Sequence, residues 1–227
     1  MTTHAVDLAP LHLPDDALHV WLADPAGPSL ELLAARYYGL LSADERERYH
    51  RYHFDADRQL YLAAHALLRL TLARYTGLSP AAIAFTRGPN GKPEALLPPP
   101  FQRLRVNLTH TRGQVGCVLS QDRDCGIDIE GGRPVRDLDG IARMMLSPSE
   151  IGHLAGLDAD ERQRGFFTLW TLKEAYAKAT GEGIGSDLTR ISFTIDTKSS
   201  DSDSVKAVTC GIGGQDAAPQ WRFYAAT

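Results

Sequence analysis

The fold is decided by a long apolar helix, which reads RQLYLAAHALLRLTLARYTG over residues 58–77. One face of this helix is apolar, because leucine and alanine recur at helical spacing. The residues concerned are Leu60, Ala64, Leu67, Leu68 and Leu72. Upstream, Ser42 followed three residues later by Glu45 has the form of a capping box, and Gly77 is typical of a helix end. We therefore expect helical structure over residues 42–75.

A second long helix is expected at about residues 160–180, and with it the chain shows an internal repeat. In each half an arginine begins the helix, a glycine follows 19 residues later, and a short strand comes next. The corresponding positions are Arg58, Gly77 and 83–85 in one half and Arg164, Gly183 and 191–193 in the other. The repeat predicts two related halves.

Short apolar runs between turn signals predict the remaining strands. These runs cover residues 104–110, 115–120, 125–130, 190–196, 205–210 and 221–224. We predict an α+β fold of two pseudo-symmetric halves, residues 1–116 and 117–227. Each half is expected to be a long helix packed on a small, mainly antiparallel sheet, with the active site at the interface between the halves.

The composition excludes several classes of protein. The 227 residues include 24 Lys+Arg against 28 Asp+Glu, so a chain of net charge −4 is a poor candidate for non-specific nucleic-acid binding. Its apolar runs are shorter than the roughly 18 residues of a membrane span, and residues 1–16 lack the pattern of a secretory signal. The three cysteines show no CxxC spacing, so we expect buried thiols. We predict a cytoplasmic protein with no nucleic-acid or membrane partner.

The motif Gly126-Ile-Asp-Ile-Glu130 brings two carboxylates together. In a strand, alternation would place Asp128 and Glu130 on the same face. One interpretation is that both face water on an exposed sheet. The other is a site for a hard cation such as Mg²⁺, which is typically held by one or two carboxylates and the phosphates of a substrate.

The motif Trp170-Thr-Leu-Lys-Glu-Ala-Tyr-Ala-Lys178 lies within the second long helix. Glu174 and Lys178 are one helical turn apart, which is compatible with an ordinary ion pair. In a functional interpretation, Glu174 would bind a metal or accept a proton, and Lys178 would meet a phosphate oxygen. The aromatic residues that precede them are interpreted as core packing.

Two further motifs are rich in polar residues. Asn107-Leu-Thr-His110 ends a predicted strand, and His110 is compatible with either a turn histidine or a general base. In Gly91-Lys-Pro93, Lys92 is either an exposed cation or one that a rigid loop directs at a phosphate. An arginine-rich run over residues 46–74 is likewise compatible with solvated surface or a phosphate contact. Neither a Walker A motif nor a GxGxxG motif is present, which disfavours an NTPase or a Rossmann fold.

Together, these four motifs resemble the signature of the 4'-phosphopantetheinyl transferase superfamily, in its longer, Sfp-type branch. The resemblance runs from about Arg48 to Phe193. Members of this branch are single-chain pseudodimers, so the resemblance implies a monomer. It also implies transfer of the phosphopantetheine arm of coenzyme A to a serine of an apo acyl, peptidyl or aryl carrier protein, with release of adenosine 3',5'-bisphosphate.

The resemblance also implies roles for single residues. The positions that match Mg²⁺ ligands are Asp128, Glu130 and Glu174. Glu174 matches the proposed proton acceptor as well, and the residues implied to be catalytic are Glu174, Lys178 and Asp128. Lys178 matches the lysine that meets the pyrophosphate. The positions that match contacts to the nucleotide end of coenzyme A are Lys92, Thr109 and His110, with Arg58 and, more loosely, Arg51.

The sequence departs from the family pattern at two places. Thr109 stands where serine is common, which keeps the hydroxyl group. The family continues beyond Tyr224 into another apolar strand, whereas this sequence stops at Thr227. Two other functions stay open on the residues alone, a Mg²⁺-dependent phosphodiesterase and a non-catalytic module that binds coenzyme A or a carrier. The carrier's pathway, whether fatty-acid, polyketide or nonribosomal-peptide, also stays open.

Overall fold

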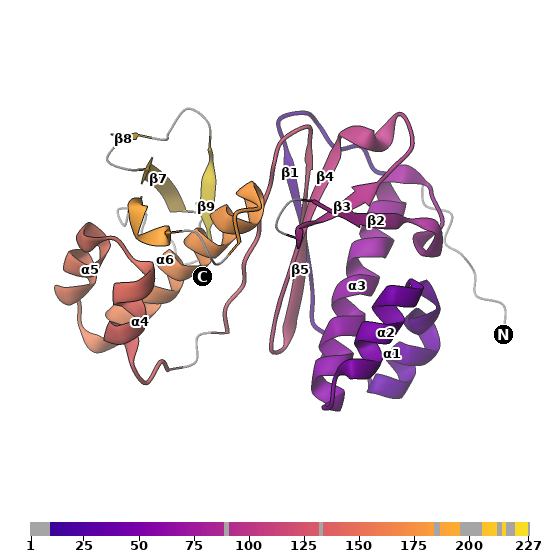
Figure 1. Cartoon of the computed structure of the whole chain (residues 1–227), viewed down its shortest axis with the longest axis horizontal. Coiled ribbons are helices and arrows are strands. Elements are labelled where there is room, and N and C mark those ends of the chain that lie inside the picture. Colours follow the sequence, from indigo (N-terminus) through magenta and orange to yellow (C-terminus); the bar gives the residue numbers. More distant parts are fainter. Residues whose placement is uncertain are drawn as a thin grey trace. The chain divides into compact units, whose positions relative to one another are not determined.

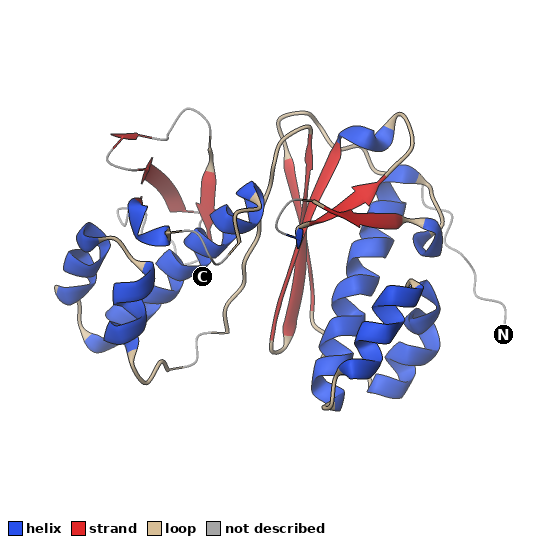
Figure 2. Ribbon diagram, in the orientation of Figure 1, coloured by secondary structure: helices blue, strands red, loops and turns tan. Residues whose placement is uncertain are grey.

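The computed structural model describes residues 10–88, 91–131, 134–183, 187–195, 206–212, 215–216 and 221–226. The chain folds into two compact units, which Figure 1 shows coloured along the sequence. The N-terminal unit contains Met1–Ile129 and Lys178–Gly181, and the C-terminal unit contains Glu130–Ala177 and Glu182–Thr227. Both combine helices with small antiparallel sheets (Figure 2), which confirms the predicted α+β class.

The N-terminal unit packs its long helix against a three-stranded antiparallel sheet of order β1-β5-β4, and two shorter helices pack on that helix. The strands are β1 (Leu18–Ala23), β4 (Leu104–Thr111) and β5 (Gln114–Gln121), with a separate hairpin of β2 (Ala84–Arg87) and β3 (Pro93–Leu96). The helices are α1 (Leu30–Tyr37), α2 (Ala43–Arg51) and α3 (Asp55–Thr76), with short 3-10 turns η1 (Tyr38–Leu40), η2 (Pro80–Ala82) and η4 (Phe101–Arg103).

Helix α3 is the centre of this unit, and its predicted apolar face is buried. Leu68 and Leu72 form one cluster with Val106 of β4 and Leu119 of β5, and Figure 1 shows α3 beside these strands. Gly77 ends the helix with φ of 69°, a left-handed conformation that glycine adopts without strain. One buried cluster therefore lies between α3 and one face of the sheet, and another joins Leu33 of α1 and Tyr49 of α2 to Leu62 of α3.

The predicted helix over residues 42–75 is two helices. The capping box of Ser42 and Glu45 is present and begins α2, but the backbone becomes extended at Tyr52 and α3 begins at Asp55. Asp55 and Asp57 lie in the first turn of α3, where negative charge is favoured by the helix dipole, so the break coincides with a new helix start.

The predicted strand over residues 125–130 is also wrong. The structure places these residues in irregular backbone after β5 ends at Gln121. The amide of Ile127 donates to the side-chain Oδ1 of Asn107 on β4, at 3.0 Å, which is a side-chain contact where a strand would form a backbone ladder. Alternation within a strand therefore does not decide where Asp128 and Glu130 point.

The described residues of the C-terminal unit form helices and a second antiparallel sheet. The helices are α4 (Leu138–Met145), α5 (Pro148–Ala155) and α6 (Ala159–Thr180), with the 3-10 turn η5 (Leu188–Arg190). The end of α6, from Lys178 on, belongs to the N-terminal unit. The sheet consists of β6 (Ile191–Ile195), β7 (Lys206–Ile212), β8 (Gln215–Asp216) and β9 (Phe223–Ala225), in which β7 pairs with the other three.

The aromatic residues of α6 pack into this unit's core. Phe166 is buried in a cluster with Phe193 of β6, while Phe167 and Trp170 pack against that cluster. These contacts confirm that the aromatic stripe serves core packing. Residues 184–186 and 196–205 lie outside the described residues, and with them one end residue of each of the predicted strands 190–196 and 205–210.

The two units repeat one order of elements. In each, a short helix begins with a complete capping box and precedes a 22-residue helix, after which come a 3-10 turn and a strand. The predicted division after residue 116 falls inside β5, whose pairing with β1 and β4 keeps it in the N-terminal unit. The first stretch of that unit runs on to Ile129.

The three cysteines are buried and free, as predicted. Burial raises the pKa of Cys117 to about 11 and that of Cys210 to about 11, because a thiolate is poorly solvated in the protein interior. Within the described part of the chain, none of the helices has the length and apolar character needed to cross a bilayer.

Replacing Leu72 with alanine should lower the free energy of unfolding by about 2–5 kcal/mol, because Leu72 is fully buried and the change leaves a cavity. The matched control is Leu70→Ala on the same helix, where 37% of the leucine is exposed and the expected loss is below about 1 kcal/mol. Urea unfolding of both variants measures the difference, and equal losses would contradict the packing described for α3.

His65 on α3 should make the protein less stable in mild acid. Burial lowers the pKa of His65 from 6.5, although its Nδ1 donates to the carbonyl of Tyr61 at 2.9 Å. Below pH 6.5 the unfolded chain therefore binds a proton that the folded protein resists, and the free energy of unfolding falls as the pH drops. His65→Gln should flatten this dependence in urea titrations between about pH 5 and pH 8. An unchanged slope would exclude His65 as its source.

Candidate active site

A cluster of polar groups surrounds Lys178 in the N-terminal unit. The Nζ atom of Lys178, in the last turn of α6, lies 2.5 Å from Oδ1 of Asp128 and 3.3 Å from Oγ1 of Thr109 on β4. A third contact, also of 3.3 Å, joins Nζ to the carbonyl oxygen of Ile127. The structure thus brings together three of the predicted site residues, from a helix, a strand and the irregular segment after β5.

Asp128 has one oxygen engaged and one free for a ligand. Its Oδ1 accepts from Lys178 and from the hydroxyl of Thr109, at 3.3 Å. Its Oδ2 is buried and has no hydrogen-bond partner among the residues that the structure describes. A buried carboxylate oxygen normally has a partner, and an oxygen ligand of this kind suits a hard cation. Asp128 therefore fits the role of a Mg²⁺ ligand.

The position of Asp128 depends on Asn107, a residue to which the sequence motif assigned no role. Asn107 is buried on β4, and its Oδ1 accepts the amide of Ile127, next to Asp128 in the chain. This contact holds the irregular segment against the strand that also carries Thr109. In β4, side chains alternate between the two faces, so Asn107 lies on the same face as Thr109 and opposite the core residue Val106.

His110 follows Thr109 on β4 and is kept neutral by its surroundings. Partial desolvation of the ring lowers its pKa below the usual value of 6.5, and the positive charge of Lys178 lowers the pKa further, although the residue as a whole remains exposed. A proton on His110 would also lower the pKa of His65 on α3, a residue that sequence reasoning did not include in the site. His110 is therefore available as a hydrogen-bonding imidazole near neutral pH.

Lys92 is held beside the last turn of α6. Its Nζ donates to the carbonyl of Ala179 at 2.7 Å and lies 3.8 Å from a carboxylate oxygen of Asp124. The last carbonyls of a helix favour a nearby cation. This contact places Lys92 at the same helix turn that carries Lys178, so two of the predicted cations lie near each other.

The predicted arginines occupy α2 and the start of α3. Arg51 pairs with Glu47 at 2.5 Å and Arg58 pairs with Asp55 at 2.7 Å. Both are partly or largely exposed, and ion pairs of this kind contribute little to stability. Their roles toward a nucleotide stay predictions.

The other two predicted carboxylates belong to the C-terminal unit. Glu174 is buried on α6, with 7% of its surface exposed, and Glu130 is exposed at the start of the unit. Across the described ranges, no group of three or more His, Cys, Asp or Glu side chains is placed to hold a metal ion. The predicted three-carboxylate metal site therefore stays a prediction, supported here by the free oxygen of Asp128.

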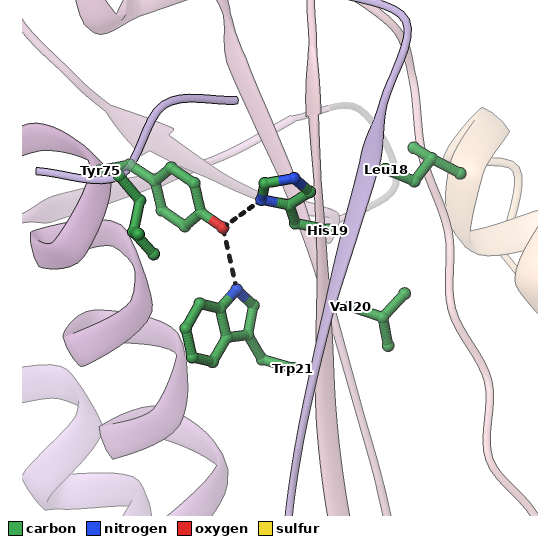
Figure 3. A pocket seen from close by; sticks show the side chains of 6 residues that line it. Leu18, His19, Val20, Trp21 and Tyr75 are labelled. Atoms are coloured by element: carbon green, nitrogen blue, oxygen red, sulfur yellow. Dashed lines mark hydrogen bonds between the residues drawn. The ribbon is translucent and has the colours of Figure 1, made fainter. Parts of the chain in front are cut away.

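A cavity of about 390 Å³ lies on β1, at the edge of the sheet opposite β4. Figure 3 shows His19 and Trp21 on one side of β1, both bonded to the hydroxyl of Tyr75, with Leu18 and Val20 on the other side. Apart from His19, its lining residues are apolar or neutral. Because its lining lacks the cluster's ionic groups, this cavity is a weaker candidate for phosphate chemistry than the cluster around Lys178.

Matches to two known protein families cover most of the chain. Residues 28–122 match a family described as 4'-phosphopantetheinyl transferase, N-terminal. Residues 124–226 match one described as 4'-phosphopantetheinyl transferase superfamily. The two matches adjoin one another and include each of the predicted site residues.

Individual relatives agree with these matches. The 4'-phosphopantetheinyl transferase HetI of Nostoc sp. is 36% identical over 178 residues, which cover 77% of this chain and 73% of the relative. A phosphopantetheinyl transferase of Thraustochytrium sp. is 32% identical over 82% of this chain and 68% of its own length. The 4'-phosphopantetheinyl transferase Sfp of Bacillus subtilis is 29% identical over 70% of this chain and 69% of its own length.

These likenesses extend over both units, and they include the strand and helix that carry Thr109 and Lys178. They agree with the family that the four sequence motifs indicate. The chain belongs to the 4'-phosphopantetheinyl transferase superfamily, in its Sfp-type branch.

Proposed function

We propose that this enzyme transfers the 4'-phosphopantetheine group of coenzyme A to a serine of an apo acyl or peptidyl carrier protein. Membership of the family supports the transfer and the carrier as acceptor. The observation that carries the proposal for this chain is the contact of Lys178 with Asp128 and Thr109. It joins a cation, a carboxylate with a free oxygen and a hydroxyl at the positions that the family motif predicts.

Lys178 is the residue we assign to the pyrophosphate of coenzyme A. Its ammonium group has three protons, and two of them make long contacts of 3.3 Å to Thr109 and to the carbonyl of Ile127. These long contacts can be exchanged for phosphate oxygens while the short contact to Asp128 is kept. Positive charge held at this point stabilises the negative charge of the reacting phosphates.

Asp128 is the residue we assign to Mg²⁺, with Glu130 and Glu174 as the further protein ligands. The free Oδ2 of Asp128 supports this assignment. A bound Mg²⁺ would neutralise charge on the pyrophosphate and orient it. The contact of Asp128 with Lys178 holds the carboxylate in one orientation, so the free oxygen has a defined direction.

The transfer itself is a displacement at phosphorus. The carrier serine oxygen forms a bond to the β-phosphorus of coenzyme A, and the bond to the leaving adenosine 3',5'-bisphosphate breaks. The serine proton goes to Glu174, either directly or through a water molecule. Glu174 is buried in the C-terminal unit, which restricts the directions in which its carboxylate can point.

The nucleotide end of coenzyme A is assigned to Lys92, Thr109 and His110, with Arg58 and Arg51 as further contacts. Lys92 supplies positive charge, while the lowered pKa of His110 makes it a neutral hydrogen-bonding group before the ligand arrives. We further propose that the enzyme acts as a monomer in the cytoplasm, without nucleic-acid or membrane partners.

Intact-mass analysis of an apo carrier protein tests this proposal. A carrier of broad acceptance, incubated with the enzyme, coenzyme A and Mg²⁺, should gain the mass of one phosphopantetheinyl group, and EDTA should prevent the gain. Asp128→Asn should lower the rate by about 100-fold or more, because it removes the charge that engages Lys178 and the cation.

The matched control is Asp122→Asn in the same segment of chain. Asp122 is exposed, pairs with Arg103, and has a φ of 57° that asparagine also tolerates. This variant should retain the wild-type rate. Normal turnover by Asp128→Asn would remove Asp128 from the metal site, and release of adenosine 3',5'-bisphosphate without a carrier would favour a phosphodiesterase.

Substitutions at the nucleotide end should distinguish two forms of the substrate. Lys92→Met and His110→Ala should raise KM for coenzyme A by about tenfold, and raise KM for 3'-dephospho-coenzyme A much less, because each removes a contact to the 3'-phosphate. Arg103→Ala, which removes an exposed cation elsewhere in the unit, should leave both values unchanged. Equal increases for both substrates would refute the assignment to the 3'-phosphate.

A further inference from the structure

Lys173, the residue before Glu174, is fully buried and has all its donors engaged. Its Nζ lies 2.8 Å from Oε2 of Glu150 and donates to the carbonyls of Leu188 and Ile191, at 2.7 and 2.6 Å. An ammonium group has three protons, so these three partners use all of them. Lys173 is therefore unable to bind a substrate phosphate without losing a buried contact.

Glu150 is engaged just as completely. Its Oε2 accepts the amide of Ser147 at the start of α5, at 2.7 Å, and its Oε1 accepts the amide of Phe193 on β6, at 2.8 Å. With Lys173, this carboxylate joins α5, α6, η5 and β6 at one point of the C-terminal unit. We name the Glu150–Lys173 pair, with the backbone groups that it binds, the C-terminal clamp.

The N-terminal unit contains the same arrangement. Glu45 of the other capping box accepts from Arg69 of α3 at 2.8 Å, and Arg69 donates to the carbonyls of Pro80 and Ile83, at 2.9 and 2.8 Å. We name this pair the N-terminal clamp. In both units a capping-box glutamate forms an ion pair with a buried cation of the long helix. That cation also donates to two backbone carbonyls, one in the 3-10 turn and one at the start of the next strand or just before it.

The two clamps differ in the residue that follows the cation. After Arg69 comes Leu70, which is 37% exposed, whereas after Lys173 comes Glu174, which is 7% exposed. The N-terminal clamp thus holds a helix turn without a carboxylate at this position. The C-terminal clamp holds the turn that carries the proposed proton acceptor.

We propose that Glu150 and Lys173 are positioning residues. They set the rotation of α6 about its axis and its translation along that axis within the C-terminal unit, and thereby the direction of the Glu174 carboxylate. The inference rests on the proposed function of Glu174. A buried ion pair adds little net stability compared with apolar packing. Its two charged groups interact favourably only when the helices that carry them are in one arrangement. Catalytic groups must be held to within about 0.5 Å, which a fully engaged ion pair next to Glu174 provides.

The test compares Glu150→Gln with Glu45→Gln, two equivalent changes in the two clamps. Both should lower the melting temperature. Only Glu150→Gln should lower kcat, by roughly 10-fold to 100-fold, with KM for coenzyme A within about twofold of wild type. If the two variants lose similar stability while both keep wild-type kcat, the C-terminal clamp is only structural and the proposal is overturned.

A second variant and a second measurement test the proposal if Glu150→Gln fails to fold. Glu150→Asp keeps the charge and shortens the side chain, so it should fold and still lower kcat, whereas Glu45→Asp should not. Hydrogen exchange should be faster in the α6 turn around Glu174 for changes at Glu150, and faster in α3 for changes at Glu45. Unchanged exchange in α6 would overturn the proposal whatever the activity.

Measuring transfer by the wild-type enzyme distinguishes a failure of this positioning proposal from a failure of the proposed function on which it rests. Absence of any transfer by the wild type would refute the proposed function and the catalytic part of the inference together. Transfer by the wild type, with the expected split between kcat and KM in Glu150→Gln, would support both. Transfer by the wild type with unchanged kcat in the variant would overturn the positioning role alone.

Discussion

The buried ion pair between a capping-box glutamate and a cation of the long helix is the constraint on which each unit depends. It joins Glu45 to Arg69 in one unit and Glu150 to Lys173 in the other. Removing one partner of such a pair costs about 3–5 kcal/mol, because the other charge is left buried without compensation. The pair therefore tolerates one arrangement of helix, turn and strand. Leucine-rich packing around α3 and aromatic packing around α6 stabilise the two units. The ion pair fixes the position of each long helix relative to the 3-10 turn and the strand that follow it.

The chemistry is built on elements that are held in this way. Thr109 and Asn107 come from a strand buried in the N-terminal core, and Asn107 ties down the irregular segment that carries Asp128. Lys92 binds the Ala179 carbonyl in the last turn of α6, where helix carbonyls favour positive charge, and Lys178 of the same turn contacts Asp128. The result is two cations at one helix end, one of them paired with a carboxylate whose second oxygen has no partner among the described residues.

Local features were predicted well, because they depend on neighbours in the chain. The capping box at Ser42 and the glycine end of α3 at Gly77 follow from backbone hydrogen bonding over a few residues, and both are present. The strand over residues 125–130 was predicted from alternation and is absent, because an asparagine side chain on β4 takes the amide that a ladder would have used. The break between α2 and α3 was missed because helical spacing continues across it.

The sequence by itself determined the family, the α+β class and the set of groups available for chemistry, because these depend on residue identity and spacing. Only the tertiary structure decided what each cation does. Lys92, Lys173 and Lys178 are alike in charge, yet one binds a helix end, one is enclosed in an ion pair and one meets Asp128. Their partners are distant in sequence, and a charge is directed by the partners and the burial that folding gives it.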